Sequence, residues 1–356
     1  VYDGATRALL KRIDQPAAET TPLALSVGGG TNFGRTALNP SGLTACAGNY
    51  GLGTCPTVPR AVEIGDMDGQ GRPDLVVGAP FHVEDSTTAH PESHCARTPG
   101  ARCELAGRAY IYRGEEIVGS SAQEILDGTA NGQGAGGTII PETYTSIKNP
   151  GAQADDRASV NVDNEQLGNT LTAIGDVGKC NAAIPPGESC PRASSVTSPD
   201  GLPDVVIAAP GVDLPEDSPD PGFGNAGVIY LIDGATRSLL STYEHPERQL
   251  GSTFGSQLGS HEPAVGDLGS TGLPDIYAPS PGQNTAFTAT GRGYVLNGNF
   301  KGGASTRLIA RLDDPTPNVR GNFGGGSAGV GDLVGGATSP ANELLVGTEG
   351  FTASPS

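Results

Sequence analysis

The sequence predicts an all-β protein: a β-propeller of four-stranded antiparallel blades that spans residues 1–356 as a single domain. Three observations lead to this prediction. A set of strand-like segments recurs four times, and such self-similarity is typical of repeat architectures. Turn-forming residues are abundant, with 55 Gly and 29 Pro. No long amphipathic helical pattern is present, so short strands separated by turns are expected. Four strands in each repeat correspond to one propeller blade.

Each repeat has four parts in the same order. The first is a short strand that ends in Gly, at 1–4, 109–114, 228–234 and 294–298. The second is a strand closed by Pro, at 9–16, 143–150, 239–246 and 308–315. The third starts with Phe-Gly or Leu-Gly, at Phe33, Leu167, Phe254 and Phe323. The fourth is a loop that opens with Gly-Asp and leads into an apolar strand, at 75–80, 205–210, 276–279 and 344–347.

The order of the parts predicts how the propeller closes. The chain begins with parts one and two and ends with parts three and four, so the N-terminal and C-terminal strands are expected to complete one blade together. The pentapeptides Asp3–Arg7 and Asp233–Arg237 are identical, which supports this assignment of repeats. Pairing of the two ends would close the ring and leave few strand edges open.

The first acidic loop, Asp66–Asp74, predicts a calcium site. Alternating positions supply the several oxygen ligands that calcium requires, and Gly69 and Gly71 permit the tight turn. The expected ligands are Asp66, Asp68, the side chain of Gln70, the backbone carbonyl of Arg72, and Asp74. The alternative is an Asx-rich turn without metal. The ion is expected to be structural, because it would neutralise a loop whose carboxylates repel one another.

Weaker copies of this loop follow. The second copy offers Asp176, Asp200 and Asp204, and an insertion splits it. The third copy offers Asp267, Thr271 and Asp275, with Gly269 in place of the middle carboxylate. Fewer charged ligands should weaken calcium binding. The fourth copy, from Asp332 to Glu343, has the wrong length, and no metal is expected there.

The six cysteines fall into three close pairs, each within its own Gly- and Pro-rich insertion. Fifteen pairings exist for six cysteines, and local pairing is favoured here. The expected disulfides are Cys46–Cys55, Cys95–Cys103 and Cys180–Cys190. The insertions cover about 41–59, 81–106, 119–141, 179–199 and 211–224. Three disulfides indicate an oxidising compartment, so we expect a secreted protein whose signal peptide was removed before Val1.

The net charge of −18 disfavours two classes of partner, nucleic acids and anionic membranes. No apolar run approaches the length of a membrane span. His82, His90 and His94 share one insertion and could bind a transition metal, although exposed loop histidines are the more common case. Gly325–Gly329 matches the Gly-x-Ser-x-Gly pattern of hydrolases but lies in a repeated strand without a following helix, so we do not interpret it as catalytic. No other catalytic set stands out.

Phe33-Gly34, the loop Asp66–Asp74 and Gly78-Ala79-Pro80 together resemble the FG-GAP repeats of integrin α-subunit propellers and their bacterial secreted relatives. That family usually has seven blades, whereas four repeats are visible here. The chain therefore either closes with four or is part of a longer propeller. The resemblance implies an extracellular binding or adhesion module for a protein or glycan, with Ca²⁺ as the bound ion.

Two alternatives to a binding module remain open at this point. One is a structural subunit of an extracellular assembly, which would use the insertions to contact its neighbours. The other is a propeller-type hydrolase or lyase with an active site in the central funnel. The metal-dependent ligand domain of integrins is not visible in this sequence, so the integrin mechanism of ligand binding is not carried over.

Overall fold

The protein is all-β, and its sheets are antiparallel. The computed structural model describes residue 5 and residues 61–80, 82, 84–85, 102–103, 106–115, 144–150, 165–180, 190, 196–212, 226–247, 249, 251–256, 266–268, 272–298, 307–331 and 343–348. Among these residues, every pairing between named strands is antiparallel. This confirms the predicted fold class at the level of all-β.

Four main sheets follow one another along the chain. The first contains, in spatial order, β1 (Ala61–Gly65), β2 (Asp74–Ala79), β5 (Arg108–Tyr112) and β6 (Tyr144–Lys148). The second contains β7 (Thr170–Gly175), β10 (Asp204–Ala209), β11 (Val228–Ile232) and β12 (Leu239–Glu244). The third contains β13 (Ile276–Ser280), β14 (Arg292–Leu296) and β15 (Leu308–Asp313). The fourth contains β16 (Phe323–Gly331) and β17 (Glu343–Thr348).

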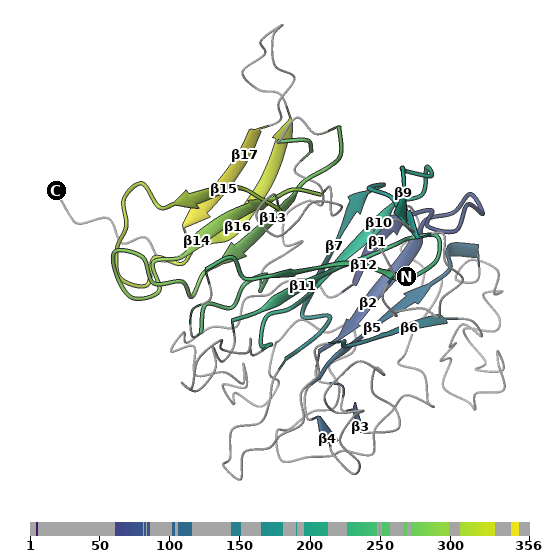
Figure 1. The fold of residues 1–356 in the computed structure, drawn as a ribbon, viewed down its shortest axis with the longest axis horizontal. Coiled ribbons are helices and arrows are strands. Elements are labelled where there is room, and N and C mark those ends of the chain that lie inside the picture. Colours follow the sequence, from purple (N-terminus) through teal and green to yellow (C-terminus); the bar gives the residue numbers. More distant parts are fainter. Residues whose placement is uncertain are drawn as a thin grey trace, which may run out of the picture.

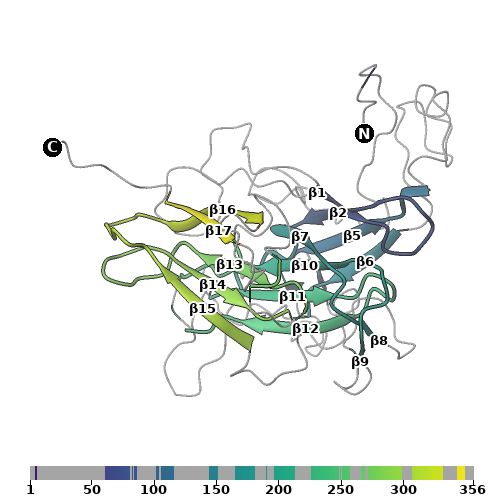
Figure 2. The ribbon, with the colours of Figure 1, turned by 90° about the horizontal axis from the view of Figure 1, so that it is seen from above.

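Neighbouring strands in space are also neighbours in the order of the repeat, so each sheet is a simple meander. Figures 1 and 2 show the sheets succeeding one another from the blue sheet of β1, β2, β5 and β6 to the yellow-green strands β13–β17. Two small ribbons lie within predicted insertions, and these insertions are therefore not wholly irregular. They are β3 (Glu84–Asp85) with β4 (Arg102–Cys103) and β8 (Lys179–Cys180) with β9 (Val196–Thr197).

Burial explains why the strands lack a uniform alternating pattern. The central strands β10 and β11 are buried at every residue, which fits their short continuous apolar sequences. The outer strands β12 and β15 alternate between more buried and more exposed positions, as a half-buried strand should. A central strand is therefore covered on both faces, and the cover comes from the neighbouring sheets.

Apolar clusters join each sheet to the next. One cluster contains Val76 and Ile111 of the first sheet together with Leu171 and Ile207 of the second. Another joins residues of the second and third sheets, and a third joins the third sheet to Leu344 and Val346 of β17. In the part of the chain that the structure describes, the core therefore forms a series of seams between consecutive sheets.

The backbone contact at these seams is the same three times. The residue that starts each Leu-Gly or Phe-Gly pair donates its N–H to the carbonyl two residues before a strand of the preceding sheet, namely β5, β11 or β14. These bonds are Leu167 N to Ala106 O (3.1 Å), Phe254 N to Ala226 O (3.0 Å) and Phe323 N to Thr290 O (2.8 Å). The predicted Phe-Gly signature is thus the element that joins one sheet to the next.

Glycines make the close approach at the seams possible. Gly107, Gly227 and Gly291 follow those carbonyls, and all three have φ between 79° and 93°. A Cβ on any of them would come within 3.0 Å of backbone atoms of the adjoining segment, a distance that real Cβ atoms do not reach. Only glycine accommodates both the left-handed conformation and the contact.

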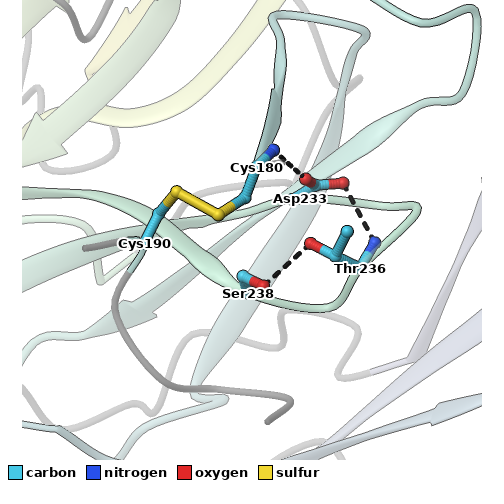
Figure 3. The surroundings of a disulfide bond; sticks show 5 residues. All are labelled: Cys180, Cys190, Asp233, Thr236 and Ser238. Atoms are coloured by element: carbon cyan, nitrogen blue, oxygen red, sulfur yellow. Dashed lines mark hydrogen bonds between the residues drawn. A yellow bond between two sulfur atoms is a disulfide. The ribbon is translucent and has the colours of Figure 1, made fainter. Parts of the chain in front are cut away.

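The predicted Cys180–Cys190 disulfide is present, with an S–S distance of 2.08 Å and a Cα–Cα distance of 5.9 Å. The backbone N–H of Cys180 donates to Asp233 at 2.5 Å, which ties the insertion to the turn after β11 (Figure 3). Of the other predicted pairs, Cys103 lies in β4, whereas Cys46, Cys55 and Cys95 lie outside the described residues.

Ring closure stays a prediction. The described sheets contain four, four, three and two strands. Apart from Ala5, residues 1–16, which are expected to complete the fourth sheet, lie outside the described residues. Phe33-Gly34 and most of the predicted insertions lie outside them as well. In the part of the chain that the structure describes, there is no helix with the length and apolar character of a membrane span.

Candidate metal centre

The first acidic loop joins β1 to β2 at the end of the first sheet. Gly65 pairs with Asp74 across the hairpin, and an irregularity in register lies just before it, between Glu63 and Gly65. Gly69 and Gly71 have φ of 76° and 86°, which is the left-handed conformation predicted for them. The loop therefore folds back on itself and brings its acidic residues together.

Three carboxylates converge in this loop. One oxygen from each of Asp66, Asp68 and Asp74 lies within 4.8 Å of the others. Asp74 is fully buried, whereas Gln70 and Arg72 are exposed on the rim. The Oδ2 atom of Asp68 is buried and has no hydrogen bond. A set of carboxylate oxygens that includes a buried atom without a hydrogen bond fits a hard cation such as calcium.

Backbone N–H groups orient each of the three carboxylates. Asp66 accepts hydrogen bonds from the N–H groups of Gln70 at 3.0 Å and Gly71 at 2.6 Å. Asp68 accepts one from Gln70 at 3.2 Å. Asp74 accepts one from Met67 at 3.0 Å and one from Gly114 at 2.9 Å. The cluster is thus pre-arranged by the loop itself, which favours binding.

The pKa values of the two end carboxylates move in opposite directions. Desolvation tends to raise the pKa of Asp66, but the N–H groups of Gly71 and Gln70 outweigh it and lower that pKa below its ordinary value. Burial raises the pKa of Asp74, and the neighbouring charge of Asp68 adds to this effect. An ion that ligates Asp74 would counter this penalty, because a divalent charge favours the ionised carboxylate.

Two arginines approach the cluster. Arg113 Nε lies 3.4 Å from Asp68 Oδ2, and its side chain is half exposed. Arg237 Nη2 lies 3.7 Å from Asp74 Oδ2, and its side chain is buried. Sequence reasoning missed both, because neither belongs to the acidic loop. The shared pentapeptide Asp-Gly-Ala-Thr-Arg drew attention to Arg237 only as a marker of the repeat.

The second copy of the loop is built differently. Asp176 accepts the N–H of Gly201, while Asp200 accepts the N–H of Leu202 at 3.1 Å and lies 3.2 Å from Lys179 Nζ. A group of three converging ligands is found, among the described residues, only in the first loop. A lysine ammonium beside Asp200 already supplies a positive charge there. Metal binding by this copy stays a prediction.

The closing aspartates have a structural role that recurs in three sheets. Asp74, Asp204 and Asp275 are almost completely buried. Each accepts the N–H of the Gly that lies two residues after β5, β11 or β14, at 2.9 Å from Gly114, 2.8 Å from Gly234 and 3.2 Å from Gly298. Burial, with Asp233 and Asp176 nearby, raises the pKa of Asp204 to about 8. The closing acid therefore fastens the loop to its own sheet whether or not a metal is bound.

The remaining predicted ligands are only partly described. In the third copy, Asp267 accepts the N–H of Gly272 at 2.6 Å, as Asp66 does from Gly71. Thr271 and Gly269 lie outside the described residues. In the fourth copy, Glu343 begins β17, and Asp332 lies outside the described residues. His90 and His94 lie outside them too, whereas His82 is buried at the end of the first sheet.

A buried Ser–His contact also escaped the sequence analysis. His245 Nε2 lies 3.0 Å from Ser280 Oγ, and Ser280 Oγ donates to the carbonyl of Ser252 at 2.8 Å. His245 Nδ1 accepts the N–H of Glu247 at 2.9 Å. The ring proton is therefore on Nε2, and His245 cannot act as a base toward Ser280. The pair is structural and lies at the seam between the second and third sheets.

Acidification should weaken the fold through His245. Burial lowers its pKa to about 4 from the ordinary 6.5. Because the folded-state pKa is depressed, the stability that neutral His245 provides is complete above pH 6.5 and is lost as the pH falls toward 4. When the pH falls from 6.5 to 5, we expect the free energy of unfolding to decrease by roughly 2 kcal/mol more in the wild type than in His245→Gln, as measured by denaturant unfolding. Equal losses in both proteins would contradict this. Burial lowers the pKa of His82 to about 4 as well, but His82 titrates in both the wild type and the variant, so its contribution cancels in the difference between them.

In comparisons with known proteins, no family model matches the chain, and no curated protein matches it. The resemblance to FG-GAP repeats thus depends on the residues alone and stays a prediction.

Proposed function

We propose that this protein is a calcium-stabilised β-propeller of the FG-GAP kind, secreted from the cell, and that it serves as a binding module for an extracellular protein or glycan. The observation that carries the metal part of this proposal is the convergence of Asp66, Asp68 and Asp74 in a hairpin loop. Oxygen-only ligation by three carboxylates suits calcium better than transition metals, which favour imidazole and thiolate.

The propeller part of the proposal is supported by the repeated seams. Three consecutive seams use the same backbone hydrogen bond and the same glycine. A constant relation between each sheet and the next is what a rotational repeat needs. The exposed Leu345 of β17 and the identity of Asp3–Arg7 with Asp233–Arg237 fit a fourth sheet that the N-terminal strands complete.

The extracellular part rests on two features. The Cys180–Cys190 disulfide fits an oxidising compartment. The net charge of −18 fits a protein that binds cations and avoids nucleic acids. A glycan array and a panel of extracellular matrix proteins, each probed with and without calcium, test the binding role. Loss of every signal, together with concentration-dependent assembly in size-exclusion chromatography, would instead favour a structural subunit.

Calcium should raise the melting temperature, and a chelator should lower it. With free calcium at about 100 times its Kd, the free energy of unfolding should increase by about 2.7 kcal/mol, because only the folded loop binds the ion. Scanning calorimetry of the wild type in calcium and in EDTA measures this. The double variant Asp66→Asn/Asp68→Asn should lose the part of the calcium-dependent shift that the first acidic loop supplies.

The control for this experiment is Asp313→Asn, which removes an exposed carboxylate of β15 away from the loop. It should keep the full calcium-dependent shift. An identical melting curve of the wild type in EDTA and in millimolar calcium would refute the metal assignment.

A further inference from the structure

Arg237 belongs to the second sheet but reaches the acidic loop of the first. It lies in the turn between β11 and β12, and its side chain is buried. Nη1 donates to the carbonyl of Gly234, and Nη2 lies 3.7 Å from Asp74 Oδ2. Its φ of 64° is left-handed, an uncommon conformation for a residue with a side chain. Such local strain is retained where the surrounding structure fixes it.

The turn that carries Arg237 is held rigidly. Asp233 accepts the N–H groups of Ala235 at 2.8 Å and Thr236 at 3.2 Å, and its carbonyl accepts the N–H of Arg237 at 2.9 Å. Asp233 also accepts the N–H of Cys180, so the disulfide-bearing insertion supports the same turn (Figure 3). The guanidinium is therefore presented to Asp74 from a fixed platform.

The acidic loop in turn reaches into the second sheet. Met67, between Asp66 and Asp68, is completely buried in the cluster that contains Ile207 and Tyr230 of the second sheet. A Cβ on Gly234 would lie 3.5 Å from the Cβ of Met67. The same short loop thus carries the three carboxylates and, through Met67, packs against the second sheet.

We propose that Arg237 is a positioning residue for the metal site: it fixes the Asp74 carboxylate from the neighbouring sheet and so couples ion binding to closure of the seam between the first two sheets. The inference rests on the proposed metal site. Asp74 Oδ1 is held by Gly114, and Oδ2 is held by Met67 and faced by Arg237, so one oxygen depends on its own sheet and the other on both sheets. Residues that orient a ligand typically change metal affinity by 10–100-fold when removed.

Arg113 provides a matched control. It also carries a guanidinium to the cluster, 3.4 Å from Asp68 Oδ2, but from the end of β5 in the same sheet and with a half-exposed side chain. Removing a positive charge beside a cation site should by itself strengthen cation binding. If charge alone matters, Arg237→Met and Arg113→Met should both bind calcium more tightly. If Arg237 positions Asp74, calcium affinity should fall in Arg237→Met and rise or stay the same in Arg113→Met.

The test is calcium titration by calorimetry of the wild type, Arg237→Met, Arg237→Lys and Arg113→Met. We expect Arg237→Met to bind about tenfold more weakly. Arg237→Lys should fall between it and the wild type, and Arg113→Met should bind at least as tightly as the wild type. An Arg237→Met protein that folds and binds calcium as tightly as the wild type would overturn the proposal. If Arg237→Met does not fold, the same comparison is made with Arg237→Lys: a lysine variant that binds calcium as tightly as the wild type would overturn the proposal.

Hydrogen exchange of the wild type tests the coupling without a substitution. Calcium should slow exchange in residues 228–244 of the second sheet as well as in 61–79, and should leave 308–331 unchanged. Protection confined to 61–79 would overturn the coupling. Absence of any calcium binding by the wild type would instead refute the proposed metal site itself, so the two failures are distinguishable.

Discussion

Gly227→Ala is expected to destabilise the protein by about 4 kcal/mol or more, which is a large fraction of the stability of a typical domain. Gly227 has a φ of 93°, and a Cβ there would lie 2.8 Å from the backbone nitrogen of Phe254 and closer still to its carbonyl oxygen. Both atoms belong to backbone and cannot move aside as a flexible side chain would. The seam between the second and third sheets must open to accept the methyl group.

The control separates this clash from ordinary backbone strain. Gly251 has a φ of 69°, and a Cβ there would meet no atom within 4 Å. Gly251→Ala should therefore cost only the left-handed conformation, about 1–2 kcal/mol. Denaturant unfolding of both variants measures the difference. Equal costs would mean that the seam does not depend on close backbone approach.

Phe254→Ala is the second large effect, and we expect a loss of about 3–5 kcal/mol. Phe254 is completely buried, and its ring lies 5.2 Å from that of His245 and 5.8 Å from that of Tyr294. Its removal would leave a cavity at the seam and would also break two aromatic contacts. Thermal and denaturant unfolding measure the loss.

The repeat itself supplies the control for Phe254. Leu167 occupies the equivalent position at the preceding seam and is equally buried. Phe254→Leu should therefore cost clearly less than Phe254→Ala, because leucine refills much of the cavity that alanine leaves. The repeated hydrogen bonds imply that the two seams are equivalent. A leucine variant as damaging as the alanine variant would show that they are not.

The sequence could predict the strands because each repeat carries its own local signals. The apolar runs after Asp74 and Asp204 are stopped by Ala-Pro, and both form strands β2 and β10. The left-handed conformations of Gly69 and Gly71 were predicted from the same local turn chemistry. Convergence of Asp66, Asp68 and Asp74 followed from their spacing within one short loop. All of these properties depend on residues that are close in sequence.

Contacts between sheets could not be predicted in this way. Arg237 lies 163 positions after Asp74, and nothing in either segment alone marks them as partners. Likewise, Thr253 has a left-handed φ of 55°, which is unusual for a β-branched residue. Gln166 and Asn322, which precede Leu167 and Phe323 at the other two seams, are left-handed as well. The seam therefore requires this conformation of the residue before each Leu-Gly or Phe-Gly pair. The two-residue ribbons in the insertions also depend on tertiary context rather than on propensity.

A crystal structure determined in excess calcium, at a resolution that shows coordination, tests the central claim most directly. The account predicts an ion in the first acidic loop with carboxylate oxygens of Asp66, Asp68 and Asp74 at about 2.3–2.6 Å. A loop that holds no ion under those conditions, with the guanidinium of Arg113 or a water molecule between the three carboxylates, would contradict it.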